Sequence, residues 1–88
     1  MVTLVCDNVW YVYLLRMRDG SLYTGITKDV KRRIEEHRKG EGSKYVRSRL
    51  PCELVYEEEH PDQSSALKRE LEIKKWHKTR KEKLVSEK

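Results

Sequence analysis

The pattern of hydrophobic and polar positions begins with two apolar runs, which a turn signal separates. Aromatic and β-branched residues, which favour strands, dominate both runs, and Gly20 lies where a tight turn needs positive φ. The pattern predicts a β-hairpin over residues 9–26. Because side chains alternate between the two faces of a strand, we expect Tyr13 and Leu15 on one face of the first strand and Val12 on the other.

After residue 26, the chain has segments with the spacing of helices and one further segment with the pattern of a strand. The expected elements are a helix over residues 27–39, a polar basic loop over 41–50, a strand over 52–58, and helices over 64–77 and 80–86. Thr27 is a candidate cap for the first of these helices, and Thr79 begins the Ser/Thr-x-x-Glu spacing of a capping box before the last. The order ββαβαα predicts an α+β fold, in which a small three-stranded antiparallel sheet is flanked by helices.

The first expected helix carries two functional groups on one edge of its apolar stripe. At 100° per residue, Arg33 and His37 fall beside the stripe formed by Val30 and Ile34. The guanidinium and the imidazole are one turn apart, so both are expected to reach the same anion.

A carboxylate falls inside the apolar arc of the next expected helix. Glu70 lies on the wheel between Leu67 and Leu71 on one side and Ile73 on the other. A charge there is costly unless it is neutralised, hydrogen-bonded or bound to a cation. One interpretation is an ion pair with Arg33 or Lys74, and another is a rim position that reaches water. The functional interpretation is a metal ligand, since Glu is a hard oxygen donor suited to Mg²⁺ or Mn²⁺.

Two phenols on neighbouring strands also have two interpretations. Tyr13 and Tyr23 fit core residues whose hydroxyls are satisfied at an edge. They also fit groups that accept a proton, which requires a nearby positive charge to lower the pKa of the phenol. Arg33 is the candidate for that charge.

An 88-residue chain has room for one small domain. We assign residues 9–88 to this domain and residues 1–8 to a flexible N-terminal arm. The apolar runs are far shorter than a membrane helix needs, no basic stretch leads into an apolar one as in a secretory signal, and 2 cysteines are too few for a disulfide scaffold. The composition excludes a membrane protein and a disulfide-rich secreted domain, and predicts a cytoplasmic protein.

Basic residues outnumber acidic ones, with 20 Lys and Arg against 15 Asp and Glu and a net charge of +5. The excess lies in residues 28–49 and 68–83, which an acidic stretch separates. A positive face is typical of proteins that bind nucleic acid, although Lys and Arg also keep ordinary helices soluble. The candidate DNA contacts, with Tyr45 able to stack on a base, are Lys28, Lys44, Tyr45, Arg47 and Arg49.

Four motifs taken together resemble the GIY-YIG nuclease domain, in particular its small stand-alone bacterial members. The first is Tyr11-Val12-Tyr13, the second is Tyr23-Thr24-Gly25, the third is an Arg-x-x-x-His helix with Arg33 and His37, and the fourth is Glu70. The resemblance covers residues 10–84. The order and spacing of the motifs are more specific than any one of them alone.

The resemblance implies an endonuclease that hydrolyses DNA phosphodiesters, with Mg²⁺ or Mn²⁺ as cofactor. Glu70 would hold the cation, and Arg33 would pair with the phosphate in the transition state. Relatives that select DNA sequences carry separate DNA-binding domains, so we expect contacts to the phosphate backbone, low sequence specificity and a role in DNA repair or recombination.

The resemblance also implies roles for the remaining motif residues. Tyr13 and Tyr23 would act on the attacking water, one as general base and the other as the group that positions it. His37 would assist proton transfer or contact the substrate. Gly25 would let a backbone approach closely where a side chain would clash.

Several positions depart from the family pattern. Tyr11 and Val12 replace the Gly and Ile of the first motif, Thr24 replaces the Ile of the second, and no Asn follows Glu70. Two alternatives therefore stand beside the nuclease: a nucleic-acid-binding module with weak or lost catalysis, and an interaction domain that depends on a larger protein partner.

Overall fold

The central element of the fold is strand β1 (Trp10–Met17), which pairs with a strand on each side. The computed structural model describes residues 9–87, so the arm expected over residues 1–8 lies outside the described part of the chain. The sheet is antiparallel, in the order β2-β1-β3. The other elements are β2 (Leu22–Thr27), α1 (Val30–Arg38), α2 (Lys44–Arg47), β3 (Cys52–His60), α3 (Gln63–Lys74) and α4 (Lys78–Ser86).

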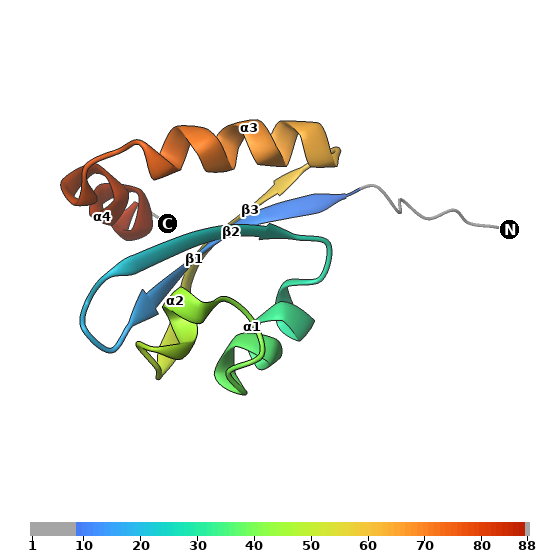
Figure 1. Cartoon of the computed structure of the whole chain (residues 1–88). Helices are drawn as coiled ribbons and strands as arrows, with labels where there is room; N and C mark the ends of the chain where they lie inside the picture. The colour runs from blue at the N-terminus through green and yellow to red at the C-terminus, as the bar shows by residue number, and fades with distance from the viewer. Residues whose placement is uncertain (1–8, 88) are drawn as a thin grey trace, which may run out of the picture.

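Helices cover both faces of this sheet, with α3 and α4 on one face and α1 and α2 on the other (Figure 1). The face toward α1 and α2 buries a cluster that includes Tyr13 and Leu15, and the opposite face buries a cluster that includes Val12 and Ile73. The alternation expected for β1 is therefore confirmed. The α+β class and the three-stranded antiparallel sheet flanked by helices are confirmed as well.

The segment expected to be a loop contains one short helix, α2, so that expectation is wrong for residues 44–47. Ser43 caps this helix, because its hydroxyl accepts a hydrogen bond from the Tyr45 amide at 3.0 Å. Val46 is fully buried against the sheet, and its burial holds the helical turn in place.

The caps expected at two helices are also wrong. Thr27 is the last residue of β2, and the carboxylate of Asp29 caps α1 by accepting from the Arg32 amide at 3.1 Å. Helix α4 begins at Lys78 without a side-chain cap. The Glu expected in the capping box at Thr79 is Glu82, whose carboxylate instead binds the Arg16 guanidinium through two contacts of 2.5 and 2.6 Å.

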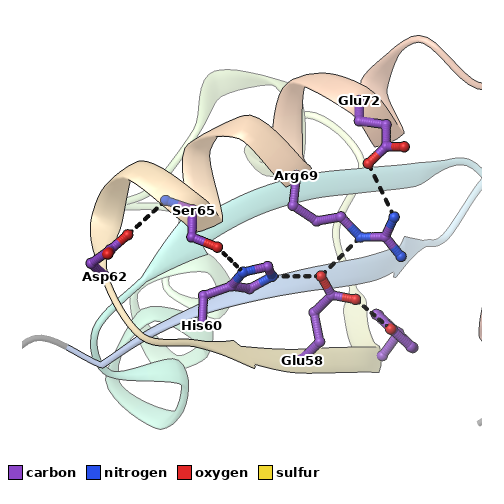
Figure 2. A network of polar contacts seen from close by, with 7 residues as sticks. Glu58, His60, Asp62, Ser65, Arg69 and Glu72 are labelled. Carbon is purple, nitrogen blue, oxygen red and sulfur yellow. Dashed lines mark hydrogen bonds and ion pairs between the residues drawn. The ribbon is translucent and has the colours of Figure 1, made fainter.

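Helix α3 is attached to the sheet by polar contacts as well as by apolar packing. Its buried side carries Ala66 and Ile73, whereas Leu67 and Leu71, expected in its apolar arc, are exposed. Ala66 permits a close approach to the sheet, and Arg69 reaches Glu58 on β3 at 2.9 Å (Figure 2). These two contacts turn the helix so that its leucines face outward.

The contact with Arg69 belongs to a larger polar network between β3 and α3 (Figure 2). His60 lies between Glu58, at 2.7 Å, and the Ser65 hydroxyl, also at 2.7 Å. Asp62 begins α3 as its N-cap and accepts from the Ser65 amide at 2.8 Å. The network fixes the rotation of α3, and with it the direction of the neighbouring side chain of Glu70.

Within residues 9–87, no helix is both long and apolar enough to cross a lipid bilayer.

Candidate active site

The candidate site is built where β1 meets the edge strand β2. Tyr13 lies directly opposite Gly25 in the strand register, and a Cβ atom placed on Gly25 would be only 2.5 Å from the Tyr13 hydroxyl. The phenol therefore lies across the backbone of Gly25, in a space that any other residue would fill. At Gly25, where a close approach of backbone was expected, the group that approaches closely is the Tyr13 side chain.

His37 lies beneath this phenol and is 1% exposed. Its Nε2 and the Tyr13 hydroxyl share a hydrogen bond of 3.0 Å, and its Nδ1 has no partner among the described residues. A Cβ on Gly42 would overlap with Nδ1 of His37, so the absence of a side chain at position 42 makes room for the ring. In this structure the imidazole contacts Tyr13 and is closed off from an anion in solvent.

Burial decides the protonation of both groups. Burial raises the pKa of Tyr13 well above its ordinary value, and Tyr23 adds to this; Arg33 lowers the pKa, while Glu70 and Glu36 raise it. Arg33 thus acts in the direction that a proton-accepting phenol requires, but its effect on the pKa of Tyr13 is smaller than that of burial. Tyr13 is a neutral phenol at physiological pH.

Burial also lowers the pKa of His37, and the positive charge of Arg33 lowers it further against the opposing effect of Glu36. A histidine has an ordinary pKa of about 6.5, so His37 is a neutral imidazole at pH 7.

The buried His37 predicts that the protein loses stability in mild acid. Below about pH 6.5 the unfolded chain binds a proton at this position that the folded chain does not, so the free energy of unfolding falls with pH by up to about 1.4 kcal/mol per unit. Urea unfolding across this range is expected to show a smaller slope for His37→Gln. His77→Gln, which changes an exposed histidine, serves as the control. Equal slopes for the wild type and His37→Gln would contradict the prediction.

Tyr23 is the phenol of the pair that is partly exposed. Its ring centroid is 6.4 Å from that of Tyr13 and 5.5 Å from that of His37. The Tyr45 ring stacks on Tyr23 at 6.0 Å, and the Arg49 guanidinium lies over Tyr45 at 3.9 Å. The two expected phenols and His37 are therefore in contact, and Tyr23 is the phenol that a molecule from solvent can reach.

This stack changes the role expected for two residues of the basic segment. The Tyr45 ring contacts both Tyr23 and the Arg49 guanidinium, so stacking on a base, as expected for Tyr45, requires one of these contacts to open. Arg49 is also held by Asp19 at 3.2 Å. Lys44 and Arg47 remain exposed on α2 and available to phosphates.

Arg33 projects from α1 toward solvent beside the phenols. Its side chain is 41% exposed, and its Nε is 3.2 Å from Glu36. Its positive charge lowers the pKa of both Tyr13 and His37, and it lies one helical turn before His37 on α1. A guanidinium in this position can bind an anion that approaches the edge of β2.

Glu70 approaches from α3, on the opposite face of the sheet. Its side chain is 13% exposed, and Oε2 is 3.3 Å from Lys74 Nζ, so one of the ion pairs expected for it is present. The negative charge of Glu70 also raises the pKa of Tyr13, so the carboxylate acts electrostatically on that phenol. With 13% of its side chain exposed, Glu70 is not turned away into solvent.

The donor chemistry at Glu70 fits a magnesium-like ion only when substrate is present. No group of three or more His, Cys, Asp or Glu within residues 9–87 is arranged to hold a metal. Mg²⁺ is nevertheless commonly bound through one or two carboxylates, several waters and a substrate phosphate. Glu70 can supply the single carboxylate of such a site.

Two contributors to the site were missed by the sequence analysis. Gly42, which follows α1, makes the space for the His37 ring. Asp19, in the hairpin turn, anchors Arg49 over Tyr45. Neither carries a local signal for such a role, because both act through contacts between segments far apart in the sequence.

Two staphylococcal proteins are similar to this chain along most of its length. A UPF0213 protein of Staphylococcus saprophyticus is 49% identical over 77 residues, covering 88% of this chain and 94% of that protein. A UPF0213 protein of Staphylococcus aureus is 48% identical over 77 residues, with the same coverage of 88% and 94%.

One solved structure and one family model also match this chain. The solution NMR structure of a UPF0213 protein of Bacillus halodurans matches with 46% identity and a TM-score of 0.60, covering 91% of this chain and 85% of that chain. Residues 9–83 match the profile of the GIY-YIG catalytic domain. The chain therefore belongs to the GIY-YIG family, alongside the small UPF0213 proteins of bacteria.

Proposed function

We propose that this protein is a divalent-metal-dependent DNA endonuclease that hydrolyses phosphodiester bonds. Its cleavage has little sequence specificity or is selective for DNA structure. Its biological role is in DNA repair or recombination. The observation that carries the proposal is the convergence on Tyr13. Tyr23 and His37 contact it, and the charges of Arg33 and Glu70 both act on it from opposite faces of the sheet. Membership of a nuclease family supports the same activity.

Glu70 is the residue that would hold Mg²⁺ or Mn²⁺, together with waters and an oxygen of the substrate phosphate. When bound, such a cation withdraws charge from the phosphate and stabilises the leaving oxygen. Lys74, which pairs with Glu70 at 3.3 Å, is 49% exposed and is free to swing away when a doubly charged ion takes its place.

Arg33 and the phenols perform the remaining chemistry. Arg33 binds a non-bridging oxygen of the phosphate and stabilises the charge that develops there. Tyr23, as the accessible phenol, orients the attacking water; its hydroxyl oxygen accepts the proton of the water as the new P–O bond forms, while the proton of the hydroxyl passes to solvent. The P–O bond to the leaving oxygen breaks, and that oxygen is protonated from solvent.

Tyr13 and His37 act as a positioning pair behind Tyr23. The Tyr13 ring is 1% exposed and its hydroxyl is hydrogen-bonded to His37. Both groups are therefore buried away from a substrate that binds at the surface. Their packing holds Tyr23 and the backbone of Gly25 in place. This assignment gives His37 a role through Tyr13 in place of direct contact with DNA.

Exposed basic residues flank the site and hold the DNA backbone. Lys28 follows β2, and Lys44 and Arg47 project from α2. Contacts of this kind are made with phosphates and carry no sequence information, which accounts for the low specificity that we propose.

The experiment that tests the proposal is a cleavage assay on single-stranded, branched and duplex DNA with Mg²⁺ or Mn²⁺. We expect cleavage of at least one of these substrates, and complete loss of it when EDTA removes the metal. Absence of cleavage on all of them, at protein concentrations where DNA is bound, would contradict the nuclease assignment.

A second candidate function is a nucleic-acid-binding module without catalysis. It is favoured by the pairing of Glu70 with Lys74, since a carboxylate that is already neutralised binds a cation less readily. This alternative expects affinity for DNA that falls with salt as phosphate contacts are lost, unchanged by Mg²⁺ and without cleavage. The cleavage assay separates the two functions.

A further inference from the structure

A small cavity of about 240 Å³ opens directly beside Arg33. It lies between the start of β1 and the start of α1, and its lining includes Trp10, Lys28, Arg32 and Arg33. The volume is below the range of about 300–1,000 Å³ that is typical of pockets for drug-sized ligands. The cavity therefore suits one group of the size of a nucleobase.

The charges around this cavity favour an anion. Its two acidic residues are engaged in local contacts: Asp29 caps α1, and Glu36 lies 3.4 Å from Arg32 and 3.2 Å from Arg33. Three cations, Lys28, Arg32 and Arg33, share the same small space. Two acids against three cations leave the cavity with a positive balance next to the arginine that we assign to the phosphate.

An aromatic face completes the cavity. The ammonium of Lys28 is 6.0 Å from the centroid of the Trp10 ring, at the outer limit of a cation–π contact. An ammonium held so loosely is easily displaced by a flat group, and the displaced charge can then bind a neighbouring phosphate. Aromatic rings with flanking cations bind nucleic acid by stacking on unpaired bases.

We propose that this cavity binds the nucleotide adjacent to the scissile phosphate, with its base unpaired and stacked on Trp10 and its own phosphate held by Lys28 and Arg32. The proposal rests on the proposed function, which places the scissile phosphate at Arg33. A base in a continuous duplex is not free to leave its stack without an energetic cost. The substrate class is therefore DNA with unpaired nucleotides at the cleavage point, such as a single strand, a flap or a branch.

The first test measures binding without cleavage. In EDTA, a short oligothymidylate is titrated into the variant Trp76→Phe. The chain has 2 tryptophans, so Trp10 is the tryptophan that this variant retains. We expect quenching of the Trp10 fluorescence, with affinity equal to that of the wild type. Replacing Trp10 by Leu is expected to weaken binding about tenfold, since stacking of one base is of this size, and Trp10→Phe is expected to retain most of the affinity.

Trp10 also packs on the buried cluster around Val12, so Trp10→Leu can weaken binding through a folding defect. A variant at surface residues tests the cavity without that effect. The double variant Lys28→Gln/Arg32→Gln leaves that cluster intact and is expected to weaken binding of the oligothymidylate by at least the same factor. Lys68→Gln/Lys75→Gln, which removes two exposed cations from α3 and the residue after it, is the matched control and is expected to bind as the wild type does.

Cleavage assays separate the failure of this inference from the failure of the proposed function. Quenching without cleavage of any DNA would support the cavity and overturn the nuclease. Cleavage that is equal on single-stranded and duplex DNA, and unchanged in Trp10→Leu, would support the nuclease and overturn the cavity. Absence of Trp10 quenching, or equal affinity in the two double variants, would also overturn it.

Discussion

Replacing Glu70 by Gln is expected to lower kcat/KM for DNA cleavage by about 1,000-fold, which corresponds to roughly 4 kcal/mol of transition-state stabilisation. Glutamine has the size of glutamate but supplies no negative charge to a divalent cation. The loss of the ion pair with Lys74, whose side chain is 49% exposed, is expected to change the free energy of unfolding by only about 1 kcal/mol, because glutamine keeps the size of the side chain. The kinetic and stability effects are therefore well separated, and cleavage assays with urea unfolding measure both.

Glu72 offers a matched control for this variant. It lies on the same helix, and its carboxylate contacts Arg69 at 3.1 Å on an exposed part of α3. Glu72→Gln is expected to cleave DNA at close to the wild-type rate. If Glu70→Gln and Glu72→Gln were equally active, the carboxylate at position 70 would have no special role and the metal assignment would be wrong.

Replacing Gly25 by Ala is expected to reduce both stability and activity. The new methyl group would lie 2.5 Å from the Tyr13 hydroxyl and 2.7 Å from Cζ of the same ring. That ring is 1% exposed and held by His37, so it cannot move away freely. Overpacking of this kind costs about 1–3 kcal/mol, and a displaced site residue lowers the cleavage rate by about 100-fold.

A double-mutant cycle identifies the cause of this effect. Tyr13→Leu removes the outer ring atoms that the methyl group would meet. In that background, Gly25→Ala is expected to cost at least about 1 kcal/mol less than in the wild type, since the two residues are in contact. An unchanged cost in the two backgrounds would show that the Tyr13 ring is not what excludes a side chain from position 25.

The elements with strong local signals could be predicted from the sequence. Strand β1 is dense in strand formers, and its alternation correctly placed Tyr13 and Val12 on opposite faces. The short helix α2 could not be predicted, because its one buried apolar anchor, Val46, is too little for a periodic pattern. The cap at Thr79 failed because the glutamate that it needed, Glu82, forms a stronger contact with Arg16 in a distant strand.

The candidate site could be predicted as a set of residues but not as an arrangement. The wheel for α3 placed Glu70 among apolar neighbours, yet it counted Leu67 and Leu71 as buried when they face solvent. The rotation of α3 depends on Arg69 and the network around Glu58, which joins residues from different elements (Figure 2). Likewise, the balance between burial and Arg33 at Tyr13 depends on packing, which no spacing along the chain reveals.

The central claim is that Glu70 receives a divalent cation beside the phenols when a phosphodiester is bound. The most direct measurement is NMR of the protein with ¹³C-labelled glutamate carboxyl groups, titrated with Mn²⁺ in the presence of uncleavable phosphorothioate DNA. Because Mn²⁺ broadens the signals of nearby nuclei, we predict that the Glu70 signal disappears at a lower Mn²⁺ concentration than the signal of Glu72. Equal broadening of the two signals, or a Glu70 signal that persists, would contradict the account.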